Sequence, residues 1–203
     1  MKQRVGVLDY GVAGNIFSIT RALENVGVYT KIVSSPADFA EIDKLVIPGV
    51  GCYADGMNKL NIRKLIEPLN NYCLHHRKPV LGICLGMQIM SKIGYEYGET
   101  EGLGFLDAEV RKIECKGVVP HMGFNAIKSI KESRLLKGID SDEAFYFMHS
   151  YELCNYTNVL ALTNYVGHTF VSAIEKDNIF GVQFHPENSR DAGMQIFKNF
   201  ISM

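Results

Sequence analysis

The sequence lacks long apolar segments, an excess of charge of either sign and a recognisable secretory leader. No run of about 18 apolar residues is present, so no helix is expected to span a membrane. The formal net charge is −1 and there is no basic stripe, so a nucleic acid is not an expected partner. The first residues, Met1 to Arg4, lead into a short apolar run without a small-residue cleavage site, so no signal peptide is predicted.

Cysteine and histidine are present, but they are not arranged as a framework. The five cysteines are an odd number with irregular spacing, and no two of them form a CxxC pair. The six histidines are scattered along the chain. Neither a disulfide framework nor a structural zinc site is therefore expected, and no metal site is predicted. Reduced thiols of this kind are typical of a cytoplasmic protein.

One domain is predicted for residues 1–203, since 47% hydrophobic residues suit one substantial core and no linker, repeat or low-complexity stretch divides the chain. In its first half, short apolar runs alternate with segments of helical periodicity. The expected strands are 5–8, 29–33, 44–47 and 79–83. The expected helices are 15–26 with Asn15 as N-cap, 61–76 with a break or restart at Pro68, and 85–93.

The second half is richer in strands and ends in a helix that carries Met194, Phe197 and Ile201 on one face. The expected strands are 105–113, 144–153, 159–163, 171–175 and 179–184. This order predicts an α/β fold with a mainly parallel central sheet, helices on both faces and a strand-rich insertion. The active site is then expected at the carboxyl ends of the strands, near Pro48 and Cys84 and after Phe184.

Gly82-Ile83-Cys84-Leu85-Gly86 is the cysteine form of the G-x-S-x-G nucleophile elbow. On a tight turn from a strand into a helix, the flanking glycines leave room for a strained backbone that presents the nucleophile. The helix N-terminus favours the thiolate, and the Leu85 N–H is expected to face the space where an oxyanion forms. A buried structural cysteine is the alternative, and the GxCxG pattern alone does not decide between the two.

Two further residues of catalytic type follow the last expected strand. His185 can accept the thiol proton and return it to a leaving amine. Glu187 can orient the imidazole and stabilise its charged form. A spacing of two places both side chains on one side of an extended segment, and Pro186 restricts the backbone between them. A surface histidine near a turn is the alternative, but the cysteine elbow upstream favours a triad of Cys84, His185 and Glu187.

The segment Pro48-Gly49-Val50-Gly51 directly follows the expected strand 44–47. Glycines on both sides of Val50 allow its peptide to turn the N–H toward the nucleophile as a second oxyanion donor. One such donor stabilises a transition state by roughly 2.7–4 kcal/mol. An ordinary β-turn is the alternative for this segment taken alone.

Together these motifs resemble those of the class I (triad) glutamine amidotransferases, and the resemblance extends in order over nearly the whole chain. The matching segments are Asp9-Tyr10-Gly11…Gly14-Asn15, Pro48-Gly49-Val50-Gly51, Gly82-Ile83-Cys84-Leu85-Gly86-Met87-Gln88, Pro120-His121-Met122-Gly123…Asn125, Tyr146-Phe147…His149-Ser150-Tyr151 and Phe184-His185-Pro186-Glu187. The elbow and the FHPE segment are shared across the family. The other segments point within it to glutaminase subunits that serve a histidine-pathway cyclase. The resemblance implies a flavodoxin-like fold.

The resemblance also implies a role for each matching residue. Cys84 would be the nucleophile, His185 the acid and base, and Glu187 its orienting partner. The other implied roles are oxyanion donors at Val50 and Leu85, contacts with the amino-acid end of glutamine at Gly51, Gln88, Ser150 and Tyr151, and a partner-facing position for Asn15, His121, Phe124, Tyr146, His149 and Asn188. Tyr146 and His149 fit equally well as core residues of an inward-facing strand. No metal and no organic cofactor is implied.

By the same resemblance, glutamine would be hydrolysed through a γ-glutamyl thioester, and the ammonia would pass by a sheltered path to a separate synthase. The expected assembly is a heterodimer with a (β/α)8-barrel synthase subunit. Three features depart from the usual family pattern on the partner side: a first loop that is one residue longer, Phe124 in place of tryptophan, and Asn188 in place of lysine. A paralogue that supplies ammonia to another amidating enzyme, for example in nucleotide-sugar biosynthesis, is therefore the second hypothesis.

Rivals from other classes share only part of the pattern. A cysteine peptidase or esterase would use the same elbow but has no need of Gln88 or of the PHMG segment. A glutaminase subunit of the pyridoxal-phosphate pathway would share length and triad, yet it fits the N-terminal and PHMG segments less well. A non-catalytic binding subunit would not need all three triad members. Acylation of Cys84 by glutamine, and not by an ester or a peptide, separates these hypotheses.

Overall fold

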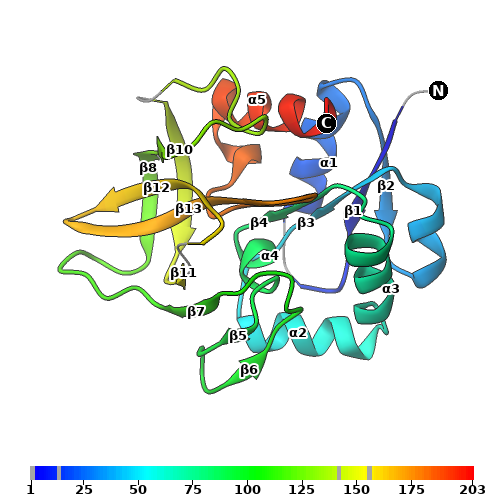
Figure 1. Cartoon of the computed structure of the whole chain (residues 1–203), viewed down its shortest axis with the longest axis horizontal. Helices are drawn as coiled ribbons and strands as arrows, with labels where there is room; N and C mark the ends of the chain where they lie inside the picture. Colours follow the sequence, from blue (N-terminus) through cyan, green and yellow to red (C-terminus); the bar gives the residue numbers. More distant parts are fainter. Residues whose placement is uncertain (1–2, 13–14, 141–142, 155–156) are drawn as a thin grey trace.

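A central sheet of eight strands organises the described part of the chain, residues 3–12, 15–140, 143–154 and 157–203 of the computed structural model (Figure 1). The strand order is β2-β1-β3-β4-β14-β13-β12-β9. The bounds are β1 (Arg4–Leu8), β2 (Tyr29–Val33), β3 (Lys44–Ile47), β4 (Val80–Ile83), β9 (Lys128–Ser129), β12 (Val159–Tyr165), β13 (His168–Lys176) and β14 (Ile179–Val182).

The first five strands of that order run parallel. β1 pairs with β2 and β3, β3 pairs with β4, and β4 pairs with β14. With β14 as the fifth strand, this is a flavodoxin-like winding. Every residue of β3, β4 and β14 is buried, as expected for strands covered on both faces. Their carboxyl ends meet at one edge of the sheet, which brings together Pro48, Cys84 and Gln183.

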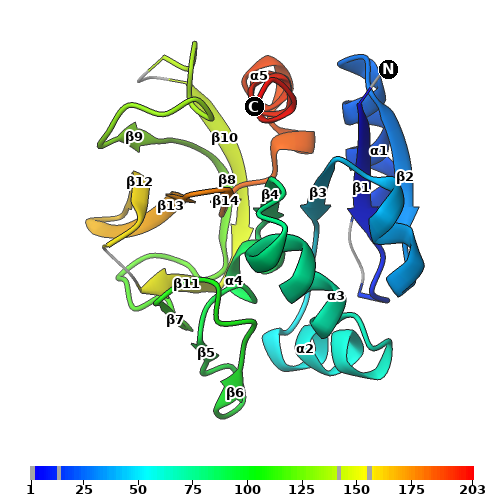
Figure 2. The ribbon, with the colours of Figure 1, turned by 45° about the vertical axis from the view of Figure 1, so that its right-hand side comes forward.

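Helices cover both faces of this parallel part. One core contains Ile19 of the first helix and Phe197 of the last, and a second core contains Leu60 and Leu69 from the middle of the chain. Figures 1 and 2 show the corresponding layers on either side of the sheet. The helices are α1 (Ile16–Asn25), α2 (Tyr53–Ile62), α3 (Ile66–Asn70), α4 (Leu85–Gln88), α5 (Arg190–Ile201), η1 (Pro36–Glu41), η2 (Asn71–His75) and η3 (Pro186–Asn188). None of those within the described ranges is long and apolar enough to cross a bilayer.

Antiparallel strands extend the sheet and form two smaller ones. β13 pairs antiparallel with β14 and β12, and β9 closes that edge. The smaller sheets have the orders β10-β8 and β11-β7-β5-β6. Their strands are β5 (Ile93–Gly94), β6 (Thr100–Glu101), β7 (Glu109–Lys112), β8 (His121–Ala126), β10 (Ala144–His149) and β11 (Tyr151–Cys154). The predicted α/β class, with a parallel sheet, helices on both faces and a strand-rich insertion, is confirmed.

The helix predicted over 61–76, with a break or restart at Pro68, begins earlier than predicted and is interrupted shortly before that proline. Helix α2 begins at Tyr53, whose backbone N–H donates to Glu96 Oε2 at 2.7 Å, a partner that local sequence does not reveal. The chain leaves the helix at 63–65, where Lys64 has a φ of 56°. Pro68 lies in the first turn of α3, where a backbone N–H has no helical partner to lose.

The helix predicted over 85–93 is a single turn, α4. The carbonyls that follow it accept hydrogen bonds from a distant loop instead of from the next helical turn. Leu103 N–H donates to Ile89 O at 2.9 Å, and Gly104 N–H donates to Ser91 O at 2.9 Å. These bonds end the helix and let the chain enter β5 at Ile93.

The strand predicted over 144–153 divides at Ser150, because its two halves pair with different sheets. β10 pairs with β8, which places His149 opposite His121. β11 pairs with β7, which places Tyr151 opposite Lys112. Strand β8 was not predicted from the sequence, and its central glycine lowers strand propensity. The change of partner at Ser150 brings this part of the chain past the carboxyl ends of the parallel strands.

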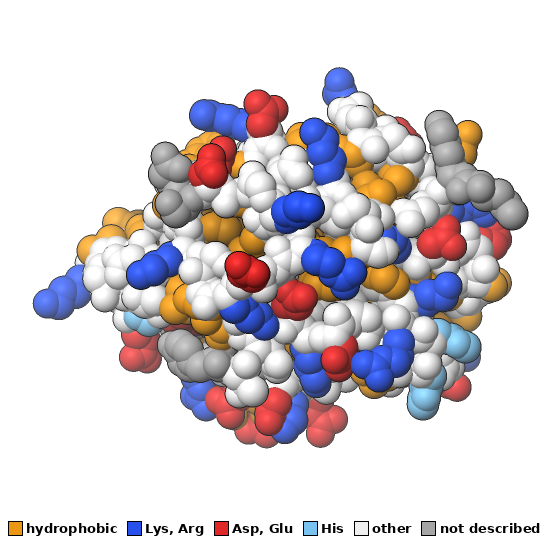
Figure 3. Space-filling model, turned by 45° about the horizontal axis from the view of Figure 1, so that its top comes forward, with side chains coloured by type: hydrophobic (Ala, Val, Ile, Leu, Met, Phe, Trp, Pro, Cys, Tyr) orange, Lys and Arg blue, Asp and Glu red, His pale blue; other side chains and the backbone are white. Residues whose placement is uncertain are grey.

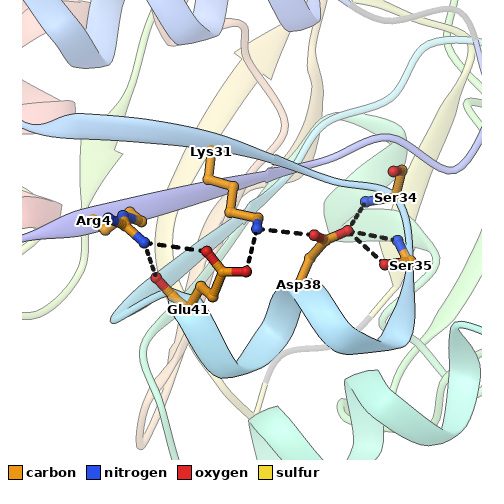
Figure 4. Close-up of polar contacts among 6 residues, drawn as sticks. All are labelled: Arg4, Lys31, Ser34, Ser35, Asp38 and Glu41. Carbon is orange, nitrogen blue, oxygen red and sulfur yellow. Dashed lines mark hydrogen bonds and ion pairs between the residues drawn. The ribbon is translucent and has the colours of Figure 1, made fainter.

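Charged side chains fasten η1 to β2, the edge strand of the main sheet (Figure 4). Lys31 Nζ lies 3.0 Å from Asp38 Oδ1 and 2.7 Å from Glu41 Oε1, and Arg4 Nη1 lies 3.3 Å from Glu41 Oε2. The Lys31 ammonium holds the pKa of the Asp38 carboxyl well below its usual range, and hydrogen bonds donated by Ser34 and Ser35 add to this effect. Charged groups at an edge strand also discourage pairing with another chain.

The face of the molecule shown in Figure 3 carries charges of both signs. Lysine and arginine side chains alternate there with aspartate and glutamate, with small apolar patches between them. Such a surface offers no extended basic track for a nucleic acid on that face.

A buried lysine at the start of β3 satisfies the end of the last helix. Lys44 is 3% exposed, and its Nζ donates to the carbonyls of Phe200 (3.0 Å), Ile201 (2.6 Å) and Met203 (3.0 Å). Carbonyls at a helix C-terminus lack helical donors and carry the negative end of the helix dipole. Lys44 therefore joins the central sheet to α5 at the end remote from the predicted active site.

Replacing Lys44 with methionine should lower the free energy of unfolding by about 2–3 kcal/mol, because buried carbonyls lose a charged donor while the apolar volume is kept. Urea denaturation measures the change. Lys59→Met is the control, since it removes only a partly exposed contact with Asp55 at 2.9 Å and should cost less than about 0.5 kcal/mol. Equal losses in the two variants would contradict the capping role of Lys44.

Candidate active site

Cys84 occupies a strained turn between β4 and α4. Its φ of 52° and ψ of −112° lie in a region that costs a residue with a side chain roughly 1–2 kcal/mol. Three hydrogen bonds hold the turn: Cys84 N–H donates to Val182 O at 2.8 Å, and Cys84 O accepts from Met87 N–H at 3.0 Å and from Gln88 N–H at 3.1 Å. The elbow predicted from the sequence is therefore present in the structure.

The two glycines of the elbow are required by close backbone approaches. A Cβ on Gly86 would lie 1.8 Å from the carbonyl oxygen of Ile47, and a Cβ on Gly82 would lie 2.7 Å from the backbone nitrogen of Met87. Neither backbone atom can move aside like a flexible side chain. The elbow can therefore pack directly against the end of β3, where the Pro48–Gly51 segment begins.

His185 and Glu187 follow β14, the strand next to β4. His185 Nδ1 lies 2.9 Å from Glu187 Oε1, and both side chains are almost fully buried. Asn15 Nδ2 donates to the same glutamate oxygen at 3.2 Å. Asn15 precedes α1 as predicted, but its side chain makes this contact and does not cap the helix. His185 Nε2 makes no hydrogen bond of ordinary geometry with the described residues, so it remains available to a reacting group.

Interactions with charged groups raise the pKa of His185 although the residue is buried. Burial by itself favours the neutral imidazole. The Cys84 sulfur and the Glu187 carboxylate outweigh it and raise the pKa of His185 to about 10. The imidazole therefore keeps its proton at neutral pH, which is the state that complements a thiolate at Cys84.

Ser189 fixes the loop that carries His185. This serine is 1% exposed. Its Oγ donates to His185 O at 2.6 Å and accepts the Tyr146 N–H at 2.9 Å, while His185 N–H donates to Tyr146 O at 2.8 Å. Strand β10 and the triad loop are thereby held together. Sequence reasoning missed Ser189, because its partner lies 43 residues away in another strand.

The two expected oxyanion donors do not both face the nucleophile. Leu85 N–H donates to Gly49 O at 3.3 Å. The C=O and N–H of a trans peptide point in opposite directions, so the N–H of Val50 is turned away from Leu85. Gly49 lies so close to Tyr10 that a Cβ would be 2.5 Å from its hydroxyl, which itself donates to Pro48 O at 2.8 Å. The expected residues are in place, but the Gly49–Val50 peptide has the opposite orientation.

The four residues expected to hold glutamine are only partly joined. Gln88 Nε2 donates to Tyr151 O at 2.9 Å and to Gln183 Oε1 at 2.9 Å. Gly51 has a φ of 120°, a conformation that favours glycine. No hydrogen bond joins Gly51 or Ser150 to Gln88 in the described part of the chain. The structure therefore joins Gln88 to Tyr151 and to Gln183, which was not among the four expected residues. Gly51 and Ser150 are not hydrogen-bonded to Gln88.

Gln183 was not singled out in the sequence, although a signal for it was present. It precedes His185 by two residues, the same spacing that separates His185 from Glu187. The side chain is fully buried, and its Nε2 lies 3.5 Å from the Cys84 sulfur. An alternation rule applied upstream of His185 would have placed Gln183 on the site.

His121 and His149 form a buried pair behind Tyr151. His121 Nδ1 lies 3.3 Å from His149 Nε2, and His149 Nδ1 lies 2.9 Å from Tyr151 O. Burial lowers the pKa of His149 to about 3 and also lowers the pKa of His121. With exposures of 3% and 5%, these side chains belong to the core, as the alternative for His149 held, and neither is exposed to a partner. They support the strand that carries Tyr151 instead.

The remaining residues expected to face a partner reach the surface to different degrees. Asn15, Phe124 and Asn188 are exposed, and Tyr146 is half-buried. The Phe124 ring lies edge-on to Tyr146 with centroids 5.6 Å apart, and the Arg190 guanidinium lies 4.7 Å above the Phe124 ring. Arg190 was missed in the sequence because this contact joins β8 to the start of α5.

The structure closes around the nucleophile. Cys84 exposes 6% of its surface and His185 2%. Surface cavities of about 980 Å³ and 580 Å³ lie elsewhere and are lined by neither residue. Among the described residues, no group of three or more histidine, cysteine, aspartate or glutamate side chains is arranged to hold a metal ion. The Cys84 side chain is therefore almost covered in this structure.

Similarity to known proteins extends over nearly the whole chain. The family described as glutamine amidotransferase class-I matches residues 7–203. The chain is 43% identical to imidazole glycerol phosphate synthase subunit HisH 1 of Campylobacter jejuni (strain RM1221) over 98% of this chain and 100% of that protein. It is 45% identical to subunit HisH of Yersinia pseudotuberculosis serotype I (strain IP32953), over 98% and 99%. Among solved structures, PurLQS from Thermotoga maritima has a TM-score of 0.77 at 17% identity, covering 100% of this chain and 99% of that one, which supports the fold.

The raised pKa of His185 leads to a titration test. In the unaltered protein, the imidazolium should persist until the pH approaches about 10. Cys84→Ala and Glu187→Gln each remove an interaction that favours the charged ring, so His185 should lose its proton at lower pH in both variants. Nuclear magnetic resonance of ¹⁵N-labelled histidine reports the protonation state directly. Glu152→Gln, beside His168 at 2.7 Å, is the control and should leave His185 unchanged. An unaltered titration in both site variants would disprove the coupling.

Proposed function

The chain belongs to the class-I glutamine amidotransferase family, and from that membership we propose that residues 1–203 form one glutaminase domain in which Cys84, His185 and Glu187 hydrolyse glutamine to glutamate and ammonia. The observation that carries the proposal is the meeting of Cys84 with the buried His185–Glu187 pair at the ends of neighbouring parallel strands. The coupling of the His185 pKa to the Cys84 sulfur supports it.

In the first half of the reaction, the Cys84 thiolate attacks the carboxamide carbon of glutamine. The tetrahedral intermediate collapses by breaking the carbon–nitrogen bond, and His185 gives its Nε2 proton to the departing nitrogen, so that ammonia leaves. Glu187 keeps the ring in place through Nδ1 and stabilises its positive charge before that transfer. The product on the enzyme is a γ-glutamyl thioester.

In the second half, a water molecule attacks the thioester carbon. His185, now neutral, accepts a proton from that water, the carbon–sulfur bond breaks, and glutamate leaves as the Cys84 thiolate is restored. The hydrogen bonds of the Gln88 amide to described residues are donated by its Nε2, at Tyr151 O and Gln183 Oε1. Its Oε1 can therefore receive the α-ammonium of glutamine, with Gly51, Ser150 and Tyr151 as neighbours along the amino-acid end.

The oxyanion hole is closed in the structure, and we propose that opening it is the regulated step. The Gly49 carbonyl accepts the Leu85 N–H that the oxyanion needs. Rotation of the Gly49–Val50 peptide would release that donor and turn the Val50 N–H toward the same space. Glycines on both sides of Val50 make such a rotation possible. Loss of one oxyanion donor costs about 10²–10³ in rate, so the closed form should hydrolyse glutamine slowly.

The proposed partner is a separate synthase subunit, the (β/α)8-barrel cyclase of imidazole glycerol phosphate synthesis. This chain is similar over nearly its full length to HisH subunits of imidazole glycerol phosphate synthase in two organisms, and this similarity supports the choice of partner. The exposed residues Asn15, Phe124, Asn188 and Arg190 form a candidate contact surface beside the triad loop. Ammonia must travel between the subunits in a sheltered path, because protonation in water removes its nucleophilicity.

Substitution of the nucleophile tests the chemistry. Cys84→Ala should abolish glutamine hydrolysis and leave the fold intact, because alanine lacks the sulfur but accepts the same backbone conformation. A glutamine-like alkylating reagent should label Cys84 ahead of the buried Cys73 and the exposed Cys154. Release of glutamate is measured by a coupled assay, and circular dichroism checks the fold. A folded variant that still hydrolyses glutamine would refute the role of Cys84.

Addition of the partner tests the closed oxyanion hole. The isolated subunit should turn over glutamine about 10²–10³ times more slowly than the complex with its cyclase, since partner binding would supply the peptide rotation. The measurement is kcat for glutamate release with and without the cyclase. Cyclase supplied with an ammonium salt is the control for the synthase step. Full activity in the isolated chain would show that the hole is preformed, and activation only by a nucleotide-sugar amidating enzyme would exclude the histidine-pathway assignment.

A further inference from the structure

Two glutamine side chains are buried side by side behind the nucleophile. Gln183 is 0% exposed and Gln88 is 6% exposed. Gln183 comes from the end of β14, and its backbone N–H donates to Ser172 O at 2.9 Å in the neighbouring strand. Gln88 is the last residue of α4 and follows Cys84 by one helical turn. An apolar side chain would fill either position without the cost of burying an amide.

Hydrogen bonding fixes the direction of both amides. The Tyr151 carbonyl can only accept, so the group that faces it at 2.9 Å must be the Gln88 NH2. The second hydrogen of that NH2 points to Gln183 at 2.9 Å, which must therefore present its oxygen. The opposite end of the Gln183 amide, its NH2, then faces the Cys84 sulfur at 3.5 Å. Exchange of oxygen and nitrogen in Gln88 would leave acceptors facing each other at Tyr151 O and at Gln183 Oε1. The same exchange in Gln183 would leave two donors facing each other.

The Cys84 sulfur consequently lies between an acceptor and a donor. The carbonyl of Met148 lies 3.9 Å away and can accept the thiol proton. The Gln183 NH2 can donate to the sulfur, and such a bond becomes stronger when the sulfur carries a negative charge. With 6% of Cys84 exposed, water contributes little to stabilising a thiolate there. Within the described part of the chain, Gln183 is the side chain other than His185 that can donate to the charged sulfur.

We propose that Gln183 is a positioning residue of the glutaminase reaction, which stabilises the Cys84 thiolate through its NH2 and orients the Gln88 amide toward the substrate through its oxygen. The inference rests on the proposed function and deepens it. One buried side chain would thus set both the nucleophile and the group that receives the amino-acid end of glutamine. Because both hydrogens of the Gln88 NH2 are used on Tyr151 and Gln183, its oxygen is held free for the substrate ammonium.

The test compares the alkylation of Cys84 by iodoacetamide in the unaltered protein and in Gln183→Met, read by peptide mass spectrometry. This readout needs neither glutamine nor a synthase. Methionine keeps the length of the side chain but can neither donate nor accept strongly. The alkylation rate at neutral pH should fall about 10- to 100-fold, as expected when a charged group loses a donor. In glutamine hydrolysis the variant should show both a lower kcat and a higher KM.

Gln183→Glu provides a readout that a purely structural role would not move. A protonated carboxyl can still donate to the sulfur, whereas a carboxylate cannot and repels it. We therefore expect the ratio of two alkylation rates, that of Gln183→Glu over that of the unaltered protein at the same pH, to fall as the introduced carboxyl ionises. The same ratio for Gln183→Met should not change with pH. Gln195→Met, which removes an amide on α5 that bonds Asn199 at 2.9 Å, is the matched control and should alkylate at the unaltered rate.

A folded Gln183→Met protein that alkylates Cys84 at the unaltered rate would overturn the proposal. If that variant does not fold, the pH dependence of Gln183→Glu decides, and a flat ratio would overturn the proposal equally. Failure of this inference can be told apart from failure of the proposed function. A protein that never hydrolyses glutamine, with or without a cyclase, but whose Cys84 alkylation still depends on Gln183, would refute the glutaminase and keep the positioning role.

Discussion

The backbone turn at Cys84 is the constraint on which the rest of the site depends. Its positive φ is unfavourable for a residue with a side chain, and it persists because bonds from β14 and from the first turn of α4 hold it. The same turn forces α4 against the end of β3, where Gly86 touches the Ile47 carbonyl. Strands β3, β4 and β14 thus meet at the nucleophile, and the oxyanion segment and the triad loop follow from their ends.

Burial explains why this site contains so many paired polar groups. Cys84, His185 and Gln183 are almost completely removed from water, so most of their donors and acceptors find a partner within the protein, while His185 Nε2 has none among the described residues. Interactions in such an environment are stronger than in water, and the raised pKa of His185 is one result. The Gly49 carbonyl follows the same rule of pairing buried polar groups, because it accepts the Leu85 N–H, which would otherwise lack an acceptor. The proposed closed form of the oxyanion hole is therefore also a well-bonded one.

Support for the site comes from segments that are remote in the sequence. Strand β10 supplies Tyr146 to the His185 loop through Ser189, and β11 supplies the Tyr151 carbonyl to Gln88. The neutral pair of His121 and His149 stands behind that carbonyl because burial keeps both rings uncharged. The strand-rich insertion is thus a wall of the active site. It also carries Phe124 to the surface beside Arg190, so one unit joins the substrate side to the candidate partner side.

The sequence by itself determined the fold class, most strand positions and the three residues proposed as a triad, because each depends on local pattern. Buried strands are continuous apolar runs, and an elbow needs its glycines. His185 and Glu187 are two residues apart as the motif requires, but Pro186–Asn188 forms a turn of 3-10 helix and not the extended segment that was expected. Local sequence pattern did not predict some of the helix and strand boundaries. The start of α2 depends on Glu96, the end of α4 depends on the loop 102–106, and the strand over 144–153 divides because its halves join different sheets.

Tertiary structure alone decided which side chains complete the site and in which state it rests. Asn15 has the residue type and position of an N-cap, but the fold brings Glu187 within its reach and its side chain binds there. The two histidines of β8 and β10 are neutral core residues because strands on either side exclude water. The orientation of the Gly49–Val50 peptide is set by Leu85, which lies on another strand's turn. These outcomes depend on contacts between distant segments, and no local spacing encodes them.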